Sequence, residues 1–173
     1  MSLQPNTLRV SALKHDSSVD GPGLRYVIFL QGCPHRCPGC HNPGTLDVDG
    51  GFLVSSEEIL CDLSRNPLIS GITLSGGEPL EQAEPLTGLV KTVKSKGLSV
   101  WLYSGYTWEE IMVSDSKWAL LSLCDVLVDG RFDKTRKSPH LPFRGSENQR
   151  IIDVPASISA GRAVPSSYQL TDN

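Results

Sequence analysis

Several features are scarce or missing in this chain of 173 residues, and each absence excludes a class of protein. No apolar run approaches the roughly 18 residues that span a bilayer, and residues 1–9 lack the apolar segment of a secretory signal. The 16 basic and 19 acidic residues leave a net charge of −3, so nothing attracts the whole chain to nucleic acid or anionic lipid. The sequence predicts a cytoplasmic protein that binds neither nucleic acid nor membranes.

Cysteines are few, odd in number and unevenly spaced. Cys33, Cys37 and Cys40 fall within eight positions, whereas Cys61 and Cys124 stand alone. A disulfide framework does not suit this pattern, because reducing compartments disfavour disulfides and such close cysteines indicate metal ligation. We expect the first three, named here the cysteine triad, to hold a metal centre, and Cys61 and Cys124 to be buried structural thiols.

Short apolar runs alternate with helical periodicity along most of the chain. Strands are predicted at 25–31, 71–75, 98–103, 125–129 and 149–154, and helices over about 56–64, 86–97 and 107–123. Alternating elements with short links imply parallel strands joined by right-handed crossovers. We predict a single α/β domain over residues 1–154, its sheet either open or curled into part of a barrel, followed by a polar, loose tail over residues 155–173.

Unusual loops follow the predicted strands. They cover residues 32–41, 75–79 and 104–106, and the chain from 130 onward. In parallel α/β folds, ligands collect at the carboxyl ends of the strands, where such loops converge. We therefore expect these distant segments to meet on one rim of the sheet.

The triad spacing, C-x3-C-x2-C, lets one loop wrap three thiolates around a small soft-metal cluster. A cuboidal cluster has four irons, so three cysteines leave one iron open for a small molecule. Zinc held by the triad with His35 or His41 is the alternative, although adjacent Cys40 and His41 are awkwardly placed to share a tetrahedral ion. Three unligated thiols this close would invite oxidation, which makes a purely structural role less favoured.

Residues 75–79 read Ser-Gly-Gly-Glu-Pro, and two interpretations stay open for them. One is a tight strand-to-helix turn that uses glycine where φ must be positive. The other is a binding loop, in which bare backbone carbonyls and the carboxylate of Glu78 accept hydrogen bonds from an ammonium group.

Taken in order, these motifs resemble the radical S-adenosylmethionine (SAM) superfamily. The resemblance is carried by C-x3-C-x2-C after the first predicted strand and Gly-Gly-Glu-Pro after the second. Residues 19–25, Val-Asp-Gly-Pro-Gly-Leu-Arg, are similar to the glycyl-radical-enzyme activating branch. Segments 103–107, 126–130 and 143–149 narrow the resemblance to the activating family of the anaerobic ribonucleoside-triphosphate reductase. It covers roughly residues 8–153.

The resemblance implies an open, partial β/α barrel of parallel strands in which the cysteine triad holds a 4Fe-4S cluster. The fourth iron would chelate SAM, and Gly76, Gly77 and Glu78 would receive its ammonium group. Gly39, Cys40 and His41 are assigned to the SAM site as well. His41 stands in for the aromatic residue that many members carry just before the third cysteine, where this chain has Gly39.

The implied activity is that of a radical SAM oxidoreductase. An electron from a low-potential donor such as flavodoxin or ferredoxin would cleave SAM, and the 5′-deoxyadenosyl radical would take a hydrogen from a glycine of the reductase. One alternative keeps SAM cleavage but acts on another glycyl-radical enzyme or on a small molecule, as 7-carboxy-7-deazaguanine synthases do. A contrasting alternative is a non-enzymatic metal- or cluster-binding module.

A few further residues carry weaker expectations. Asp20 and Asp129 are interpreted as turn-forming residues with a ligand role as the alternative, and His35 as a surface or loop residue. The loop over residues 131–144 has five basic residues and one acidic residue. A solvated loop is the ordinary interpretation of such a run, and docking of the protein partner is the alternative.

Overall fold

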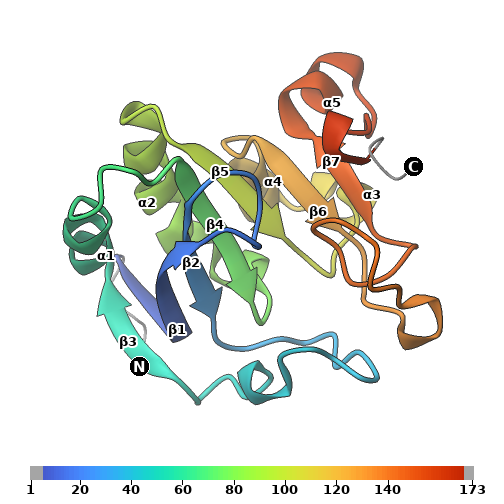
Figure 1. Cartoon of the computed structure of the whole chain (residues 1–173), viewed down its shortest axis with the longest axis horizontal. Coiled ribbons are helices and arrows are strands. Elements are labelled where there is room, and N and C mark those ends of the chain that lie inside the picture. The colour runs from blue at the N-terminus through green and yellow to red at the C-terminus, as the bar shows by residue number, and fades with distance from the viewer. Residues whose placement is uncertain (1–5, 170–173) are drawn as a thin grey trace.

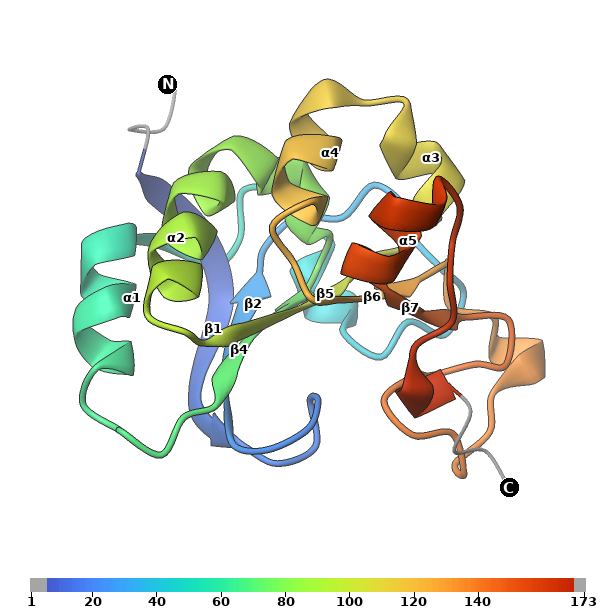
Figure 2. The ribbon, with the colours of Figure 1, turned by 90° about the horizontal axis from the view of Figure 1, so that it is seen from above.

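The computed structural model describes residues 6–169, and they form one mixed sheet with α-helices gathered on one face (Figures 1 and 2). Within these residues the sheet has seven strands in the order β3-β1-β2-β4-β5-β6-β7. The strands are β1 (Thr7–Ser17), β2 (Arg25–Leu30), β3 (Phe52–Ser55), β4 (Gly71–Gly76), β5 (Ser99–Tyr103), β6 (Val126–Asp129) and β7 (Arg150–Asp153). The α-helices are α1 (Ser56–Leu63), α2 (Ala83–Ser95), α3 (Trp108–Met112), α4 (Asp115–Leu121) and α5 (Val154–Ala160). Short 3-10 turns are η1 (Pro43–Thr45), η2 (Pro79–Gln82), η3 (Lys134–Arg136) and η4 (Ser167–Gln169).

The centre of the sheet is parallel, as the sequence predicts. β2, β4, β5 and β6 pair side by side in parallel, with Tyr26 opposite Ile72 and Ile72 opposite Val100. The flanks are antiparallel: β1 pairs with β2 and β3, and β7 pairs with β6. A wholly parallel sheet was therefore the wrong expectation. β7 follows β6 through a loop rather than a crossover helix, and such a return brings a strand in antiparallel.

Strand β1 and its neighbour β3 were not among the predicted strands. Leu8 and Val10 are fully buried, while the residues beside them are partly exposed, which is the alternation of a strand with one face in the core. β1 pairs with β3 from Thr7 opposite Ser55 to Val10 opposite Phe52. These two strands extend the parallel centre outward on the side of the N-terminus (Figure 1).

The capping boxes predicted at the starts of two helices are confirmed. Ser55 and Glu58 form a complete capping box at α1, and Thr107 and Glu110 form another at α3. Helical sequence over 107–123 does not give one helix, however. Ser114 adopts extended backbone between α3 and α4, so the chain turns there and α4 can bury Leu120 and Leu121.

Two clusters of buried side chains lie on opposite faces of the sheet. Along β5, Val100 and Leu102 belong to the large core shared with the helices, whereas Trp101 belongs to a smaller cluster on the other face. That smaller cluster includes Phe143 and Tyr168, whose rings meet Trp101 edge-on at 5.3 and 5.2 Å between centroids. The face without helices is thus partly covered by loops.

The sequence predicted a loose tail over residues 155–173, and the described part of that segment contains most of α5 (Val154–Ala160) and the turn η4 (Ser167–Gln169). α5 begins with the Asp153 side chain accepting a hydrogen bond from Ala156 N and ends at Gly161 in the left-handed region. Backbone hydrogen bonds then join Val164 and Ser166 to β7. Apolar periodicity is not needed for this, because the backbone itself pairs with the strand. The last part of the predicted tail, residues 170–173, lies outside the described residues.

Among residues 6–169, no helix combines the length and apolar character that a bilayer crossing requires.

Candidate functional site

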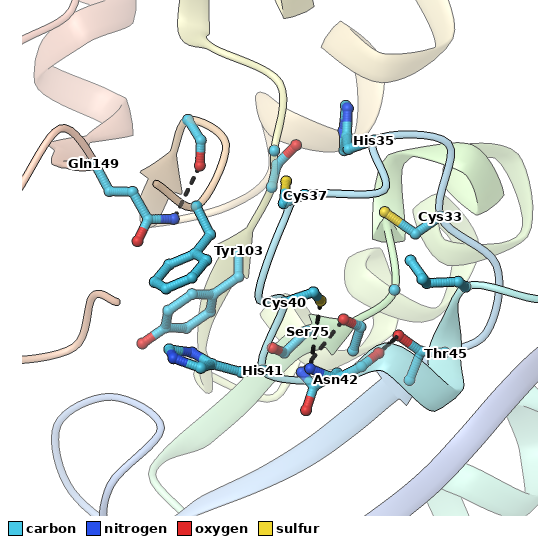
Figure 3. Close-up of a pocket in the computed structure, with 17 residues that line it drawn as sticks. Cys33, His35, Cys37, Cys40, His41, Asn42, Thr45, Ser75, Tyr103 and Gln149 are labelled. Atoms are coloured by element: carbon cyan, nitrogen blue, oxygen red, sulfur yellow. Dashed lines mark hydrogen bonds between the residues drawn. The ribbon is translucent and has the colours of Figure 1, made fainter. Parts of the chain in front are cut away.

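A pocket lies at the carboxyl ends of the parallel strands. Its walls come from the cysteine loop (residues 32–42), the glycine loop (residues 75–79), the end of β5 and the chain after β6. Figure 3 shows the cysteine triad around the same pocket as His41, Ser75, Tyr103 and Gln149. The expectation that four distant loops meet on one rim is confirmed, since all four contribute to the lining.

The cysteine loop leaves β2 and folds back on itself before η1. Gly32 N donates to Thr45 O at 2.8 Å, which closes the base of the loop, and Cys40 N donates to Cys37 O at 3.1 Å within it. All three triad thiols are free and partly exposed at the pocket. Burial raises the pKa of the Cys33 thiol, so a metal that binds there must displace its proton.

No three His, Cys, Asp or Glu side chains within residues 6–169 converge closely enough to hold one metal ion. A single zinc ion needs its ligands within about 2.3 Å of one point. A cuboidal cluster makes a different demand, because each thiolate binds its own iron and the sulfur atoms stay apart. The lack of a converged single-ion site among the described residues is therefore compatible with a cluster.

The glycine loop lies directly against the chain that enters the cysteine loop. Gly77 N donates to Leu30 O and Glu78 N donates to Gly32 O, each at 2.8 Å. A side chain on Gly77 would meet the carbonyl oxygen of Gly32 at 2.3 Å, and Gly76 has a φ of +98°. Both glycines are thus required by close backbone packing, while Ser75, Gly76 and Gly77 also line the pocket.

Glu78, which the resemblance placed in the SAM site, does not join them in the lining. Its side chain is completely buried, and its carboxylate accepts hydrogen bonds from Leu80 N, Ser104 Oγ and Gly105 N. The fourth partner is His35, whose Nε2 lies 2.9 Å from Oε2. His35 lies in a loop, one of the two positions expected for it, but its side chain is only 5% exposed and lines the pocket. Sequence patterns do not reveal where a loop side chain turns.

His41 lines the pocket as expected, and its ring contacts that of Phe132 at 4.5 Å between centroids. Cys40 lines it too, whereas Gly39 does not. A side chain on Gly39 would instead meet the stem of Lys134 at 3.2 Å. Gly39 also has a φ of +74°, so backbone conformation is what favours glycine before the third cysteine.

Several lining residues were not predicted as site residues. Tyr103 closes one wall at the end of β5, and burial raises the pKa of its hydroxyl. Gln149 holds the opposite loop: Nε2 donates to Gly130 O, and Oε1 accepts from Gly145 N. Asn42 and Thr45 also line the pocket. The position of Tyr103 at the end of a predicted parallel strand is a signal that could have identified it as a lining residue.

Asp20 and Asp129 both form hydrogen bonds with residues outside the pocket. Asp129 is buried, accepts a hydrogen bond from Trp108 N at the start of α3, and pairs with Arg150. Asp20 accepts from the hydroxyl of Ser17, and its backbone carbonyl accepts from Thr73. Neither side chain lines the pocket.

The two remaining cysteines differ in environment. Cys124 is buried as expected, and that burial strongly raises the pKa of its thiol. Cys61 is exposed on α1, so its predicted burial was wrong. It occupies a helix position on the side away from Ile59 and Leu63, which are buried.

Basic residues after β6 form part of the rim beside the pocket. Arg131 pairs with Glu110 at 3.1 Å. Exposed side chains on and after η3, named here the basic triplet, are Lys134, Arg136 and Lys137. The loop is fixed in place by Glu147 N donating to Arg136 O and by the β-bridge between Lys137 and Ser146.

Comparisons with known proteins agree with these features. The family model described as "4Fe-4S single cluster domain" matches residues 19–152. The chain is 40% identical over 141 residues to the anaerobic ribonucleoside-triphosphate reductase-activating protein of Vibrio cholerae, covering 77% of this chain and 90% of that protein. It is 37% identical to the protein of that name from Enterobacteria phage T4, with 77% and 86% covered. Among solved structures, QueE from Escherichia coli matches with a TM-score of 0.47 and 19% identity over 58% of this chain and 54% of that one.

Proposed function

The chain belongs to the family of anaerobic ribonucleoside-triphosphate reductase-activating proteins, and we propose on this basis that it is a radical SAM enzyme that installs a glycyl radical on that reductase. One structural observation supports this proposal for particular residues: the cysteine triad and the glycine loop line the same pocket at the strand ends. A cluster ligated by the triad would therefore stand beside bare backbone that can receive a small zwitterionic cofactor.

The triad residues Cys33, Cys37 and Cys40 are the proposed ligands of a 4Fe-4S cluster. Their thiols are free, come from one loop and border one pocket, which is the donor set that such a cluster needs. With three cysteines the fourth iron stays open, and that is where SAM would bind. Cys61 and Cys124 lie elsewhere and take no part.

SAM is proposed to lie along Ser75, Gly76 and Gly77, with His41 and Tyr103 beside its flat adenine. Backbone carbonyls, rather than the carboxylate of Glu78, accept the hydrogen bonds of the ammonium group. When bound, the two cofactors supply the one-electron cleavage of SAM and the hydrogen abstraction that follows. The chain's own residues hold SAM in one orientation and exclude water around it.

The sheet is proposed to act as an incomplete barrel. Its order runs from β3 to β7 within the described residues, and these outer strands do not pair with each other. An opening of this kind gives a glycine-bearing loop of a large protein access to the pocket, and the basic triplet on the rim would help to dock it. Cys33 also borders a second cavity, lined by Arg9, Pro34 and Arg36, where we propose that a flavodoxin or ferredoxin delivers the electron.

Anaerobic reconstitution with iron and sulfide tests the cofactors. We expect about four irons per chain and a reduced-cluster spin-resonance signal that changes when SAM is added, with Cys61→Ala as a matched control that keeps both. Incubation with reductant, SAM and the reductase should then give a glycine-centred doublet signal. A cluster whose signal ignores SAM would contradict SAM binding, and SAM cleavage without a doublet would contradict the reductase as the target.

A further inference from the structure

Glu78 joins three of the four loops that build the pocket, although it does not line the pocket itself. Its Oε1 accepts from Leu80 N at 3.1 Å and Ser104 Oγ at 2.9 Å, and its Oε2 accepts from Gly105 N at 2.8 Å. The remaining partner, His35, lies in the turn between the first two triad cysteines. One buried carboxylate thus joins the cysteine loop, the glycine loop and the turn after β5.

His35 Nε2 lies 2.9 Å from Oε2 of Glu78. A carboxylate only accepts hydrogen bonds, so a contact of this kind uses the tautomer of His35 that carries its proton on Nε2. The imidazole edge also packs on the ring of Tyr106 at 4.5 Å between centroids. Among the described residues, no other side chain of the turn between Cys33 and Cys37 hydrogen-bonds to another loop.

Gly105 gives independent support, because its missing side chain makes room for the histidine. A Cβ at Gly105 would lie 2.4 Å from His35 Cδ2 and 2.7 Å from Nε2. Gly105 does not have a positive φ, so backbone conformation is not what requires glycine here. The turn after β5 is therefore shaped to admit the imidazole against Glu78.

We propose that His35 and Glu78 form a clasp that fixes the cysteine loop relative to the glycine loop, and that both are positioning residues rather than ligands of SAM. The inference rests on the proposed function for the identity of the cofactors. SAM must reach the open iron with one end while the glycine loop holds it, so the separation of the two loops decides whether both contacts form together. Within the clasp, His35 lines the pocket and Glu78 is buried behind it, so the clasp fixes that separation at the pocket wall.

The test compares four variants after anaerobic reconstitution. His35→Leu removes the donor, His35→Gln keeps a side-chain N–H donor, and Gly105→Ala displaces the imidazole without changing either clasp residue. Gly88→Ala is the matched control, because a Cβ there meets nothing within 4 Å. Iron per chain, SAM affinity and the spin-resonance signal of the reduced cluster with and without SAM are measured for each, together with the melting midpoint of the metal-free protein.

We expect His35→Leu and Gly105→Ala to retain the cluster but bind SAM about tenfold or more weakly, with a smaller SAM-induced change in the spin-resonance signal. His35→Gln should recover most of the SAM affinity, and Gly88→Ala should match the wild type. SAM affinity equal to wild type in both His35→Leu and Gly105→Ala would overturn the clasp. If both variants lose the cluster and also melt at lower temperature, the proposal is overturned as well, because the contact would then stabilise the fold and have no separate role in SAM binding.

Failure of the wild-type protein itself is a separate result. If the wild type holds no cluster or shows no response to SAM, the proposed function fails, and the role of the clasp toward SAM fails with it. If the wild type responds and the two clasp variants respond equally, only the clasp is overturned.

Discussion

Replacing Gly77 by alanine puts a methyl group where two stretches of backbone cross. The added Cβ would stand 2.3 Å from Gly32 O and 3.0 Å from Thr45 O, and the side chain points at this backbone rather than into the pocket. Neither oxygen can rotate away as a flexible side chain could. The turn after β4 must therefore move off the chain that leads into the cysteine loop.

The cost follows from the contacts that this movement disturbs. Overpacking of a tight site costs about 1–3 kcal/mol. The hydrogen bonds on either side of residue 77, from Gly77 N to Leu30 O and from Glu78 N to Gly32 O, are each worth about 0.5–1.5 kcal/mol. We expect Gly77→Ala to lower the free energy of unfolding by about 2–6 kcal/mol, and the melting midpoint by roughly 5–20 °C for a domain of this size.

Thermal and urea unfolding of the metal-free protein measure this without any contribution from the cofactors. Gly88→Ala in α2 is the matched control; its Cβ is unobstructed, and alanine in a helix interior is about 0.5–1 kcal/mol more stable than glycine. An unfolding free energy for Gly77→Ala within about 0.5 kcal/mol of the wild type would refute the reasoning, because surface substitutions have effects of that size.

Further predictions concern the cysteines, the basic triplet and the stability of the protein at acid pH. Alanine at any triad position should abolish cluster assembly, whereas Cys61→Ala and Cys124→Ala should keep it, as iron analysis would show; retention by a triad variant contradicts the ligand assignment. In the native protein Cys61 should react with an alkylating agent, while Cys124 should react only on unfolding because it is buried with a raised pKa. Changing the basic triplet to serine should slow glycyl-radical formation most at low salt and leave uncoupled SAM cleavage unchanged, and equal loss of both would instead place the loop in the fold. Hydrogen bonds from Arg150 hold the pKa of Glu109 at about 2, below its ordinary 4.5, so this stabilisation is present above pH 4.5 and is lost as pH falls toward 2. In the Glu109→Gln variant the melting midpoint should therefore fall less steeply with pH over that range than in the wild type. An equally steep fall would contradict a stabilising pair between Glu109 and Arg150.

Local patterns in the sequence were sufficient for the central elements and for the location of the pocket. Capping boxes at Ser55 and Thr107 depend on residues three positions apart, and the buried strands depend on short apolar runs, so both are visible without a structure. Parallel strands bring their carboxyl ends to one edge, which is why the convergence of the loops could also be predicted.

The orientation of Glu78 and the packing around Gly77 could not be predicted from the sequence, because both depend on contacts between distant segments. Glu78 belongs to a motif that indicates ligand binding, yet its carboxylate turns inward because Ser104, Gly105 and His35 supply donors from other loops. No spacing along the chain encodes that arrangement. The sequence likewise indicates that Gly77 provides bare backbone for a ligand. In the structure, the atom that first excludes a side chain at this position is the carbonyl oxygen of Gly32.

The chain after α5 gives the sheet a protected border. A strand at the end of a sheet presents unpaired amides and carbonyls to which a strand of another molecule can add. On β7 those groups are already occupied: Asp153 N donates to Val164 O, Ser166 N donates to Ile151 O, and Ile151 N donates to the side chain of Gln169. At the opposite border, β3 is only four residues long and offers little length for such addition. The polar segment that the sequence predicted to be a loose tail therefore occupies the backbone groups of β7 to which another strand could add.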